Sequence, residues 1–151
     1  MGRTFTIRTQ IARPVAEVFD AIVSRDRLVG YFAGGSSGDL EEGSEITWTW
    51  HDTDDCPTAE CPVLVKKIVN NELIQLVIDS KKWLKTTNEA YDVIVTMELE
   101  ALDEDNTMLS ISEQGWKDNE EGIKGSYDNC EGWTHMALCL KAYLQHGIDL
   151  R

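Results

Sequence analysis

The chain has 151 residues, a formal net charge of -13 and a sequence pI of about 4.5. A surface this acidic repels phosphate backbones and anionic lipids, so we expect neither a nucleic-acid partner nor a membrane partner. No apolar run approaches the ~20 residues needed to cross a bilayer, and the first residues lack the apolar block of a signal peptide. We therefore expect a cytoplasmic protein, folded as one domain over residues 1–151.

The N-terminal part is predicted to hold one strand and two short helices. Residues 4–11 alternate polar and apolar, as a strand does. Arg13-Pro14 then starts a helix, because proline suits the first helical turn. Residues 24–26 break the pattern before a second short helix, and residues 34–38 form a flexible turn. The two predicted helices carry apolar residues at helical spacing: Val15, Val18, Phe19 and Ile22 in the first, and Leu28, Val29, Tyr31 and Phe32 in the second.

The middle of the chain is predicted to be a series of strands joined by turns. Apolar residues alternate with polar ones most clearly in residues 45–50 and 91–99, and Asn70-Asn71 and residues 103–106 have turn composition. Consecutive hairpins imply an antiparallel sheet. The predicted strands are residues 45–50, 61–69, 73–79, 91–99 and 108–113, whereas residues 51–59 form a polar loop.

A long amphipathic helix is predicted to end the chain. Asp118 is its expected N-cap, with Glu121 three residues later as in a capping box. Three early glycines weaken the first turns, so the helix could start as late as Ser126, and Gly147 is its expected stop. One apolar arc holds Ile123, Cys130, Trp133, Ala137, Leu140 and Leu144, and the other side of the helix holds His135, Cys139 and His146.

This order of elements predicts an α+β fold. A sheet followed by one long helix must fold that helix back across its face to bury both apolar surfaces. Such an arrangement leaves a crevice between helix and sheet, and crevices of this kind bind small molecules.

Three segments resemble a known superfamily. Residues 11–21, Ile-Ala-Arg-Pro-Val-Ala-Glu-Val-Phe-Asp-Ala, resemble the first strand-to-helix junction of the START-like superfamily. Glu113-Gln114-Gly115-Trp116 and Glu131-Gly132-Trp133-Thr134-His135-Met136 resemble its branch similar to the C-terminal domain of the activator of the 90-kDa heat-shock protein ATPase. The resemblance covers residues 3–150. It implies a helix-grip fold, with a curved antiparallel sheet of about six to seven strands around the C-terminal helix, two short helices after strand 1, and a cavity between sheet and helix.

Function is less constrained, because this superfamily hosts lipid carriers, cyclases, hormone receptors and co-chaperones on one scaffold. Tryptophan offers a large apolar surface and one N–H donor, so an aromatic set could line the cavity. The alternative is that the same side chains only fill the core. The predicted cavity lining is Trp48, Trp50, Ile78, Val95, Met97, Ile111, Glu113, Trp133, Ala137 and Leu140.

Glu113 alternates with the core-facing Leu109 and Ile111, so its carboxylate could point toward the cavity mouth and act as an acid or base. The favoured alternative places it at a strand end in water. A cyclase-type reaction would rest on Glu113, with Asp79 or Tyr91 as helpers, and we identify no catalytic motif in the chain.

A metal site is not expected. His51, Cys56 and Cys61 are ligand types that zinc accepts, but no second pair of ligands accompanies them. A solvated acidic loop with two free thiols is favoured, and a Cys56–Cys61 disulfide is a further alternative. No other cofactor is indicated.

The sequence thus favours non-catalytic binding of a small apolar or amphipathic molecule between sheet and helix. The first alternative is a co-chaperone-like module that meets a chaperone or another protein through its acidic surface. The second alternative is a cyclase-type enzyme that uses a cavity carboxylate.

Overall fold

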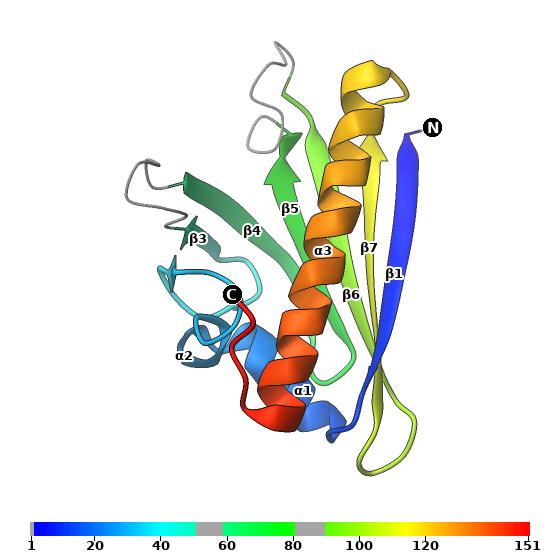
Figure 1. Cartoon of the computed structure of the whole chain (residues 1–151). Coiled ribbons are helices and arrows are strands. Elements are labelled where there is room, and N and C mark those ends of the chain that lie inside the picture. The colour runs from blue at the N-terminus through cyan, green and yellow to red at the C-terminus, as the bar shows by residue number, and fades with distance from the viewer. Residues whose placement is uncertain (1, 51–58, 81–89) are drawn as a thin grey trace.

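Seven strands form one antiparallel sheet, and a long helix lies across one of its faces (Figure 1). A computed structural model describes residues 2–50, 59–80 and 90–151. The strands, in the sheet order β1-β7-β6-β5-β4-β3-β2, are β1 (Arg3–Ile11), β7 (Thr107–Trp116), β6 (Asp92–Ala101), β5 (Leu73–Asp79), β4 (Ala59–Val69), β3 (Glu45–Trp50) and β2 (Gly35–Ser36). The helices are α1 (Val15–Val23), α2 (Arg25–Leu28) and α3 (Glu120–His146). The predicted α+β helix-grip fold is confirmed.

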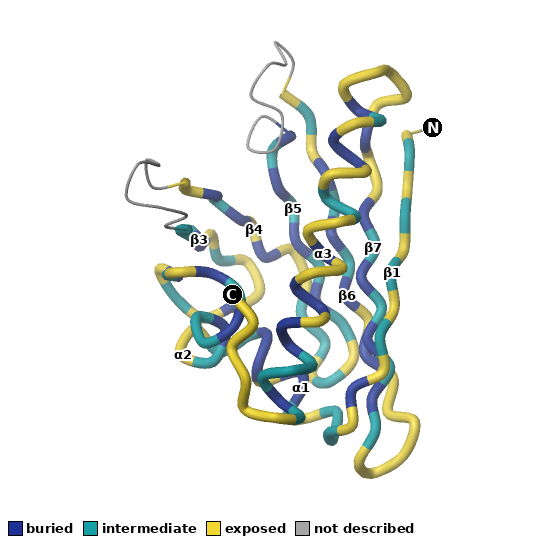
Figure 2. Tube along the Cα trace, viewed as in Figure 1, coloured by how far each residue is buried: buried dark blue, intermediate teal, exposed yellow. Residues whose placement is uncertain are grey.

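Alternation decides which face of each strand is buried. On β5 the buried residues Ile74, Leu76 and Ile78 stand opposite Met97, Val95 and Val93 of β6. Successive side chains point to opposite faces of a strand, so this register puts one continuous apolar surface under α3. Dark buried segments accordingly follow the inner side of the sheet and of the helix (Figure 2).

The segment between α1 and β3 differs from its prediction. The second helix is a single turn, Arg25–Leu28, and ends before the expected Tyr31 and Phe32. Ser24 has extended backbone angles, so the helix is interrupted there. It is both the C-cap of α1 and the N-cap of α2. The expected flexible turn over residues 34–38 contains a two-residue strand, in which Gly35 pairs with Thr49 and Ser36 with Trp48.

Helix α3 begins earlier than its glycines suggested, and its cap is a different residue. Asn119, not Asp118, is the N-cap, because its side-chain oxygen accepts a hydrogen bond of 2.8 Å from the Gly122 backbone N–H. Packing requires a glycine at position 122, although glycine was expected to weaken this turn of the helix. A Cβ at that position would collide with the carbonyl oxygen of Lys117. The helix ends at Gly147, whose left-handed φ of 64° glycine tolerates.

Four residues of the predicted apolar arc of α3, Trp133, Ala137, Leu140 and Leu144, are buried. The other two, Ile123 and Cys130, are only half-buried, and Cys130 lines a groove on the outer side of the helix. Cys139, which was assigned to the outer side, is buried as well, with 1% exposure. The reason is the chain after the helix, which turns back toward the loop after α2 (Figure 1). There the Arg151 guanidinium donates a hydrogen bond of 3.0 Å to the Ala33 carbonyl. None of the described helices is long and apolar enough to cross a membrane.

Candidate ligand pocket

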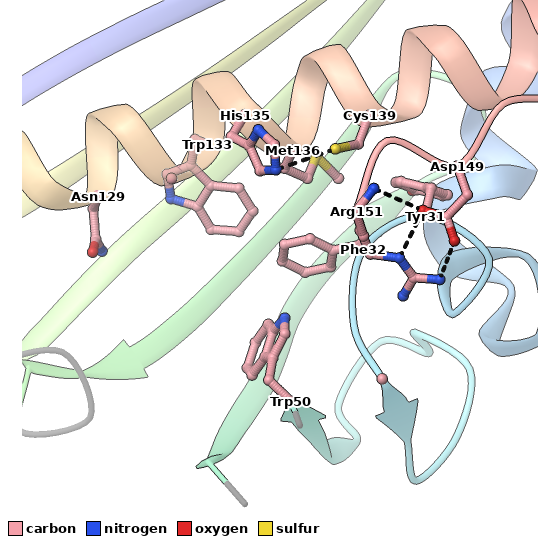
Figure 3. A pocket seen from close by; sticks show the side chains of 12 residues that line it. Tyr31, Phe32, Trp50, Asn129, Trp133, His135, Met136, Cys139, Asp149 and Arg151 are labelled. Atoms are coloured by element: carbon pink, nitrogen blue, oxygen red, sulfur yellow. Dashed lines mark hydrogen bonds and ion pairs between the residues drawn. The ribbon is translucent and has the colours of Figure 1, made fainter. Parts of the chain in front are cut away.

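A pocket of about 740 Å³ lies between α3 and the elements that stand beside it, namely the segment after α2, the end of β3 and the C-terminal residues (Figure 3). Its walls are mostly apolar and aromatic. The larger apolar side chains that line it are Tyr31, Phe32, Trp50, Trp133 and Met136.

Phe32 joins the aromatic wall of the pocket. Its ring is stacked against Trp133 of α3, with centroids 5.8 Å apart. It meets Trp50 of β3 edge-on at 5.4 Å. Aromatic pairs prefer these offset and edge-to-face arrangements. One half-buried side chain therefore connects the helix to a strand on the far side of the pocket.

Trp48 and Trp50 share one face of β3, as alternation predicted, but they have different surroundings. Trp48 is 1% exposed and belongs to the core, where its ring meets Phe32 edge-on at 5.1 Å. Trp50 is the last residue of β3 and only partly buried, and it lines the pocket. A shift of two positions along a strand thus separates a core residue from a wall residue.

Two of the ten residues predicted to line the cavity, Trp50 and Trp133, do line this pocket. The others lie in the core, where they pack between sheet and helix, and Glu113 lies behind Asn129 and Trp133. Whether any of the ten contacts a ligand stays a prediction. The predicted residues that the structure places in the apolar core are Trp48, Ile78, Val95, Met97, Ile111, Ala137 and Leu140.

Glu113 of β7 is held by two side chains that descend from α3. The Asn129 side-chain amide donates to both carboxylate oxygens, at 2.7 Å and 3.0 Å. The Trp133 indole N–H donates to one of them at 2.9 Å. Asn129 and Trp133 are four residues apart, so they lie on one face of the helix. Both line the pocket, and Glu113 does not.

The favoured expectation that Glu113 ends a strand in water is wrong, because its exposure is 1%. The strand continues to Trp116, so Glu113 lies well inside it. Burial raises the pKa of Glu113 from 4.5 to about 7, against the opposing effect of hydrogen bonds from Asn129 and Trp133. A carboxyl with this pKa changes charge near neutral pH.

A second set of polar residues lies at the end of the pocket away from Asn129 (Figure 3). His135 Nε2 lies 3.5 Å from the Cys139 sulfur. Asp149 and Arg151 form an ion pair at 2.9 Å, and hydrogen bonds from Arg151 lower the pKa of Asp149 to about 2. Burial raises the pKa of the Cys139 thiol. His135 was assigned to the outer side of α3; it is exposed, and it lines both this pocket and a second groove along the outer side of the helix.

The other sequence candidates lie elsewhere. Asp79 alternates with the buried Ile78 and so faces away from the core. Tyr91 packs edge-on against Trp116, with ring centroids 6.4 Å apart. His51 and Cys56 fall outside the described residues, and Cys61 is buried on β4. The residues that the structure describes contain no group of three or more His, Cys, Asp or Glu that could hold a metal ion.

Apart from Trp50 and Trp133, the sequence did not predict the lining of this pocket, and it gave no functional role to Tyr31, Phe32, Asn129, Asp149 or Arg151. One signal was available, since Asn129 stands one helical turn before Trp133 and thus shares its face. Asp149 and Arg151 carried no such signal, because their positions depend on how the chain folds back after α3.

Comparison with known proteins now identifies the family. The model of the family "Activator of Hsp90 ATPase homolog 1-like protein" matches residues 12–145. The chain belongs to this family. The predicted resemblance is therefore confirmed, although a search of curated proteins gives no match.

Solved structures share the fold over nearly the whole chain. Protein SSP2350 from Staphylococcus saprophyticus is 25% identical, with a TM-score of 0.76, and the alignment covers 99% of this chain and 96% of that one. The Aha1 dimer from Colwellia psychrerythraea, solved in solution, is 16% identical, with a TM-score of 0.72, and the alignment covers 96% of this chain and 98% of that one. DynU16, a protein in the dynemicin biosynthetic locus, is 16% identical, with a TM-score of 0.74, and the alignment covers 95% of this chain and 48% of that one. The last two show likeness of fold alone.

Proposed function

We propose that this protein binds a small apolar or amphipathic molecule in the pocket between α3, the segment after α2 and β3. The observation that carries the proposal is the pocket of about 740 Å³, which stays open beside a filled core. Ligand sites typically measure ~300–1,000 Å³ and combine apolar walls with a few polar groups. The aromatic wall and the two polar ends of this pocket have that composition.

The walls account for affinity, and the ends account for orientation. Burial of apolar ligand surface contributes about 25 cal/mol per Å², and the rings of Phe32, Trp50 and Trp133 offer flat surfaces for it. Asn129 at one end and Arg151 at the other are polar groups on the lining. A ligand with an apolar body and a polar group at one end would match this arrangement.

A cyclase-type reaction receives less support from the geometry. Its acid or base would be Glu113, but Asn129 and Trp133 donate hydrogen bonds to this carboxylate and separate it from the pocket. The likeness to a protein from a biosynthetic locus is one of fold.

A protein-interaction role is the second candidate, and one observation favours it. Tyr127 and Leu138 are 62% and 52% exposed, and both line a shallower groove along α3. Together with the family name and the acidic surface, this groove would suit a protein partner. Titration of the labelled protein with a 90-kDa heat-shock chaperone tests the idea, and an unchanged fluorescence anisotropy would refute it.

Gly132 provides the sharpest test of the pocket. It lines the pocket, and a Cβ added there would meet nothing within 4 Å. Gly132→Leu should therefore place a side chain in the opening without disturbing the core. Gly132→Ala is the matched control, because it gives the same helix benefit with little bulk.

Native mass spectrometry of the freshly purified protein is the measurement, followed by extraction of anything bound. We expect a small-molecule adduct on the wild type and on Gly132→Ala, and a much smaller one on Gly132→Leu. Equal adducts on all three proteins would show that the molecule binds elsewhere. If the wild type carries no adduct and also fails to take up apolar probes added at high concentration, the proposal is refuted.

A further inference from the structure

Arg151 brings a fixed positive charge to one end of the pocket. Among the described residues of the lining, it is the only lysine or arginine, and Asp149 is the only aspartate or glutamate. The chain as a whole carries a formal net charge of -13. Because the lining is balanced in charge, a negatively charged ligand group meets less repulsion there than on the acidic surface elsewhere.

The guanidinium of Arg151 is held by two segments of the chain. Its Nε and Nη2 atoms donate to the two carboxylate oxygens of Asp149, at 3.0 Å and 2.9 Å. Its Nη1 atom donates to the Ala33 carbonyl, in the segment after α2, at 3.0 Å. These contacts use three of the five N–H donors of a guanidinium. The other two have no partner among the residues that the structure describes, and the group that carries them is already fixed in place.

Asp149 orients Arg151 without covering it. Hydrogen bonds from Arg151 lower the pKa of Asp149 to about 2, so this carboxylate stays ionised and keeps its partner at neutral pH. In Figure 3 it lies on the side of the guanidinium away from Phe32 and Trp50. The side nearer the aromatic wall therefore remains accessible to a ligand. A guanidinium that is already shared with Asp149 suits a singly charged group, and a planar carboxylate matches its fork of donors.

The two ends of the pocket differ in their effect on an anion. The Arg151 side chain is 35% exposed, so a carboxylate bound there keeps part of its hydration and avoids most of the cost of burying a charge. Asn129, at the other end, stands in front of the buried Glu113 carboxylate, which repels a second anion when it is ionised. An apolar acid would therefore place its head group at Arg151 and its body against the rings of the wall.

We infer that Arg151 binds the head group of the ligand, that Asp149 positions Arg151, and that the pocket selects apolar carboxylic acids in their ionised form. The inference rests on the proposed function, and it names the class of ligand. Arg151 donates to a carboxylate through charge-assisted hydrogen bonds, which are about twice as strong as those to a neutral acceptor. A neutral ligand of the same shape loses that difference.

Three probes with one apolar body measure this preference by calorimetry at pH 8: biphenyl, biphenyl-4-carboxamide as the neutral head group and biphenyl-4-carboxylate as the anion. For the wild type we expect the carboxylate to bind roughly tenfold more tightly than the carboxamide, the difference between a charge-assisted and a neutral hydrogen bond. The two head groups have nearly the same shape, so their ratio of affinities reports the charge.

Arg151→Gln removes the charge and keeps a side-chain amide that can donate to the Ala33 carbonyl. In this variant the ratio of carboxylate to carboxamide affinity should fall to one or below, with the affinity for biphenyl unchanged. Arg151→Lys keeps the charge and should retain a smaller preference for the carboxylate. Arg8→Gln is the matched control, because Arg8 is exposed on β1, does not line the pocket and changes the net charge by the same amount. It should keep the tenfold ratio.

The ratio within each variant keeps the test decisive. If the C-terminal segment moved away in Arg151→Gln, biphenyl would bind more weakly too, and the ratio of carboxylate to carboxamide would still report on Arg151. No preference in the wild type, an unchanged ratio in Arg151→Gln, or an equal loss in Arg8→Gln would overturn the inference and leave the pocket intact as a binding site. Failure of the wild type to bind any of the three probes would instead refute the proposed function.

Discussion

The two sides of α3 are packed in different ways. Toward β1 and β7 the helix buries Ala137 and Leu140, and the strand residues Val95 and Ile111 are buried in the same core, all with 2% exposure or less. Toward β3 and the segment after α2 its Trp133 ring meets the Phe32 ring at a centroid distance of 5.8 Å, and a pocket of about 740 Å³ stays open. The sheet curves away from the helix on that side (Figure 1). A helix that lies over one half of a curved sheet closes a core there and leaves space over the other half.

The tryptophans of β3 should show this difference most strongly. Trp48→Ala removes a fully buried side chain and should destabilise the protein by about 3–5 kcal/mol. Trp50→Ala removes a partly exposed wall residue and should cost much less stability, while weakening the binding of an apolar probe such as biphenyl severalfold. Urea denaturation and calorimetry would measure both effects. Similar losses of stability in the two variants would break the distinction between core and wall.

The buried carboxylate should make stability depend on pH. Because the pKa of Glu113 is raised from 4.5 to about 7 on folding, the stabilising effect of its protonation is complete below pH 4.5 and is lost as the pH rises through 7. The difference is on the order of 3 kcal/mol at most. Unfolding free energy should thus increase between pH 7.5 and pH 5.

Glu113→Gln is the control for that dependence. The glutamine does not titrate, so the rise in stability toward pH 5 should largely disappear, and at pH 7.5 the variant should be more stable than the wild type. Falling self-repulsion in this acidic protein acts in the same direction in both proteins, so the difference between their two curves isolates Glu113. Parallel curves would show that Glu113 is not buried in its charged form.

The fold was predictable because strands and long helices repeat with fixed periods. In residues 73–79 every second residue is a large aliphatic one, and the segment forms a strand with those limits whose burial alternates. The inward series on β6 follows the same rule. Glu113 also obeyed the alternation. The expectation of water around it failed, because the length of β7 beyond Glu113 depends on pairing with β1 and β6.

The pocket was predictable only in part, because its walls come from segments without a period. Trp50 and Trp133 were identified from their positions on a strand and a helix. Phe32 lies after a one-turn helix, where no repeat fixes the direction of its side chain. Cys139 shows the same limit, since a helical wheel places it opposite the sheet and takes no account of the returning chain that covers it.

Gly132 should separate binding from stability, with a smaller effect on stability than the changes above. Gly132→Leu places a better helix former inside α3 and should raise the unfolding free energy by up to about 1 kcal/mol. The same change should abolish probe binding in calorimetry, whereas Gly132→Ala should gain similar stability and keep binding. A loss of stability in Gly132→Leu would mean that the space beside Gly132 is not open.

The two cysteines of α3 provide the mildest test of the difference between its two sides, because this test needs no substitution. Cys139 is buried beside the pocket with a raised thiol pKa, whereas Cys130 is half-buried at the outer groove. Thiolate is the reactive form, so iodoacetamide should modify Cys130 faster than Cys139, as followed by mass spectrometry of peptides. A saturating concentration of biphenyl should slow the modification of Cys139 further and leave that of Cys130 unchanged, because only Cys139 lines the larger of the two pockets. Equal protection of both thiols would indicate that the probe stabilises the whole helix rather than occupying one side of it.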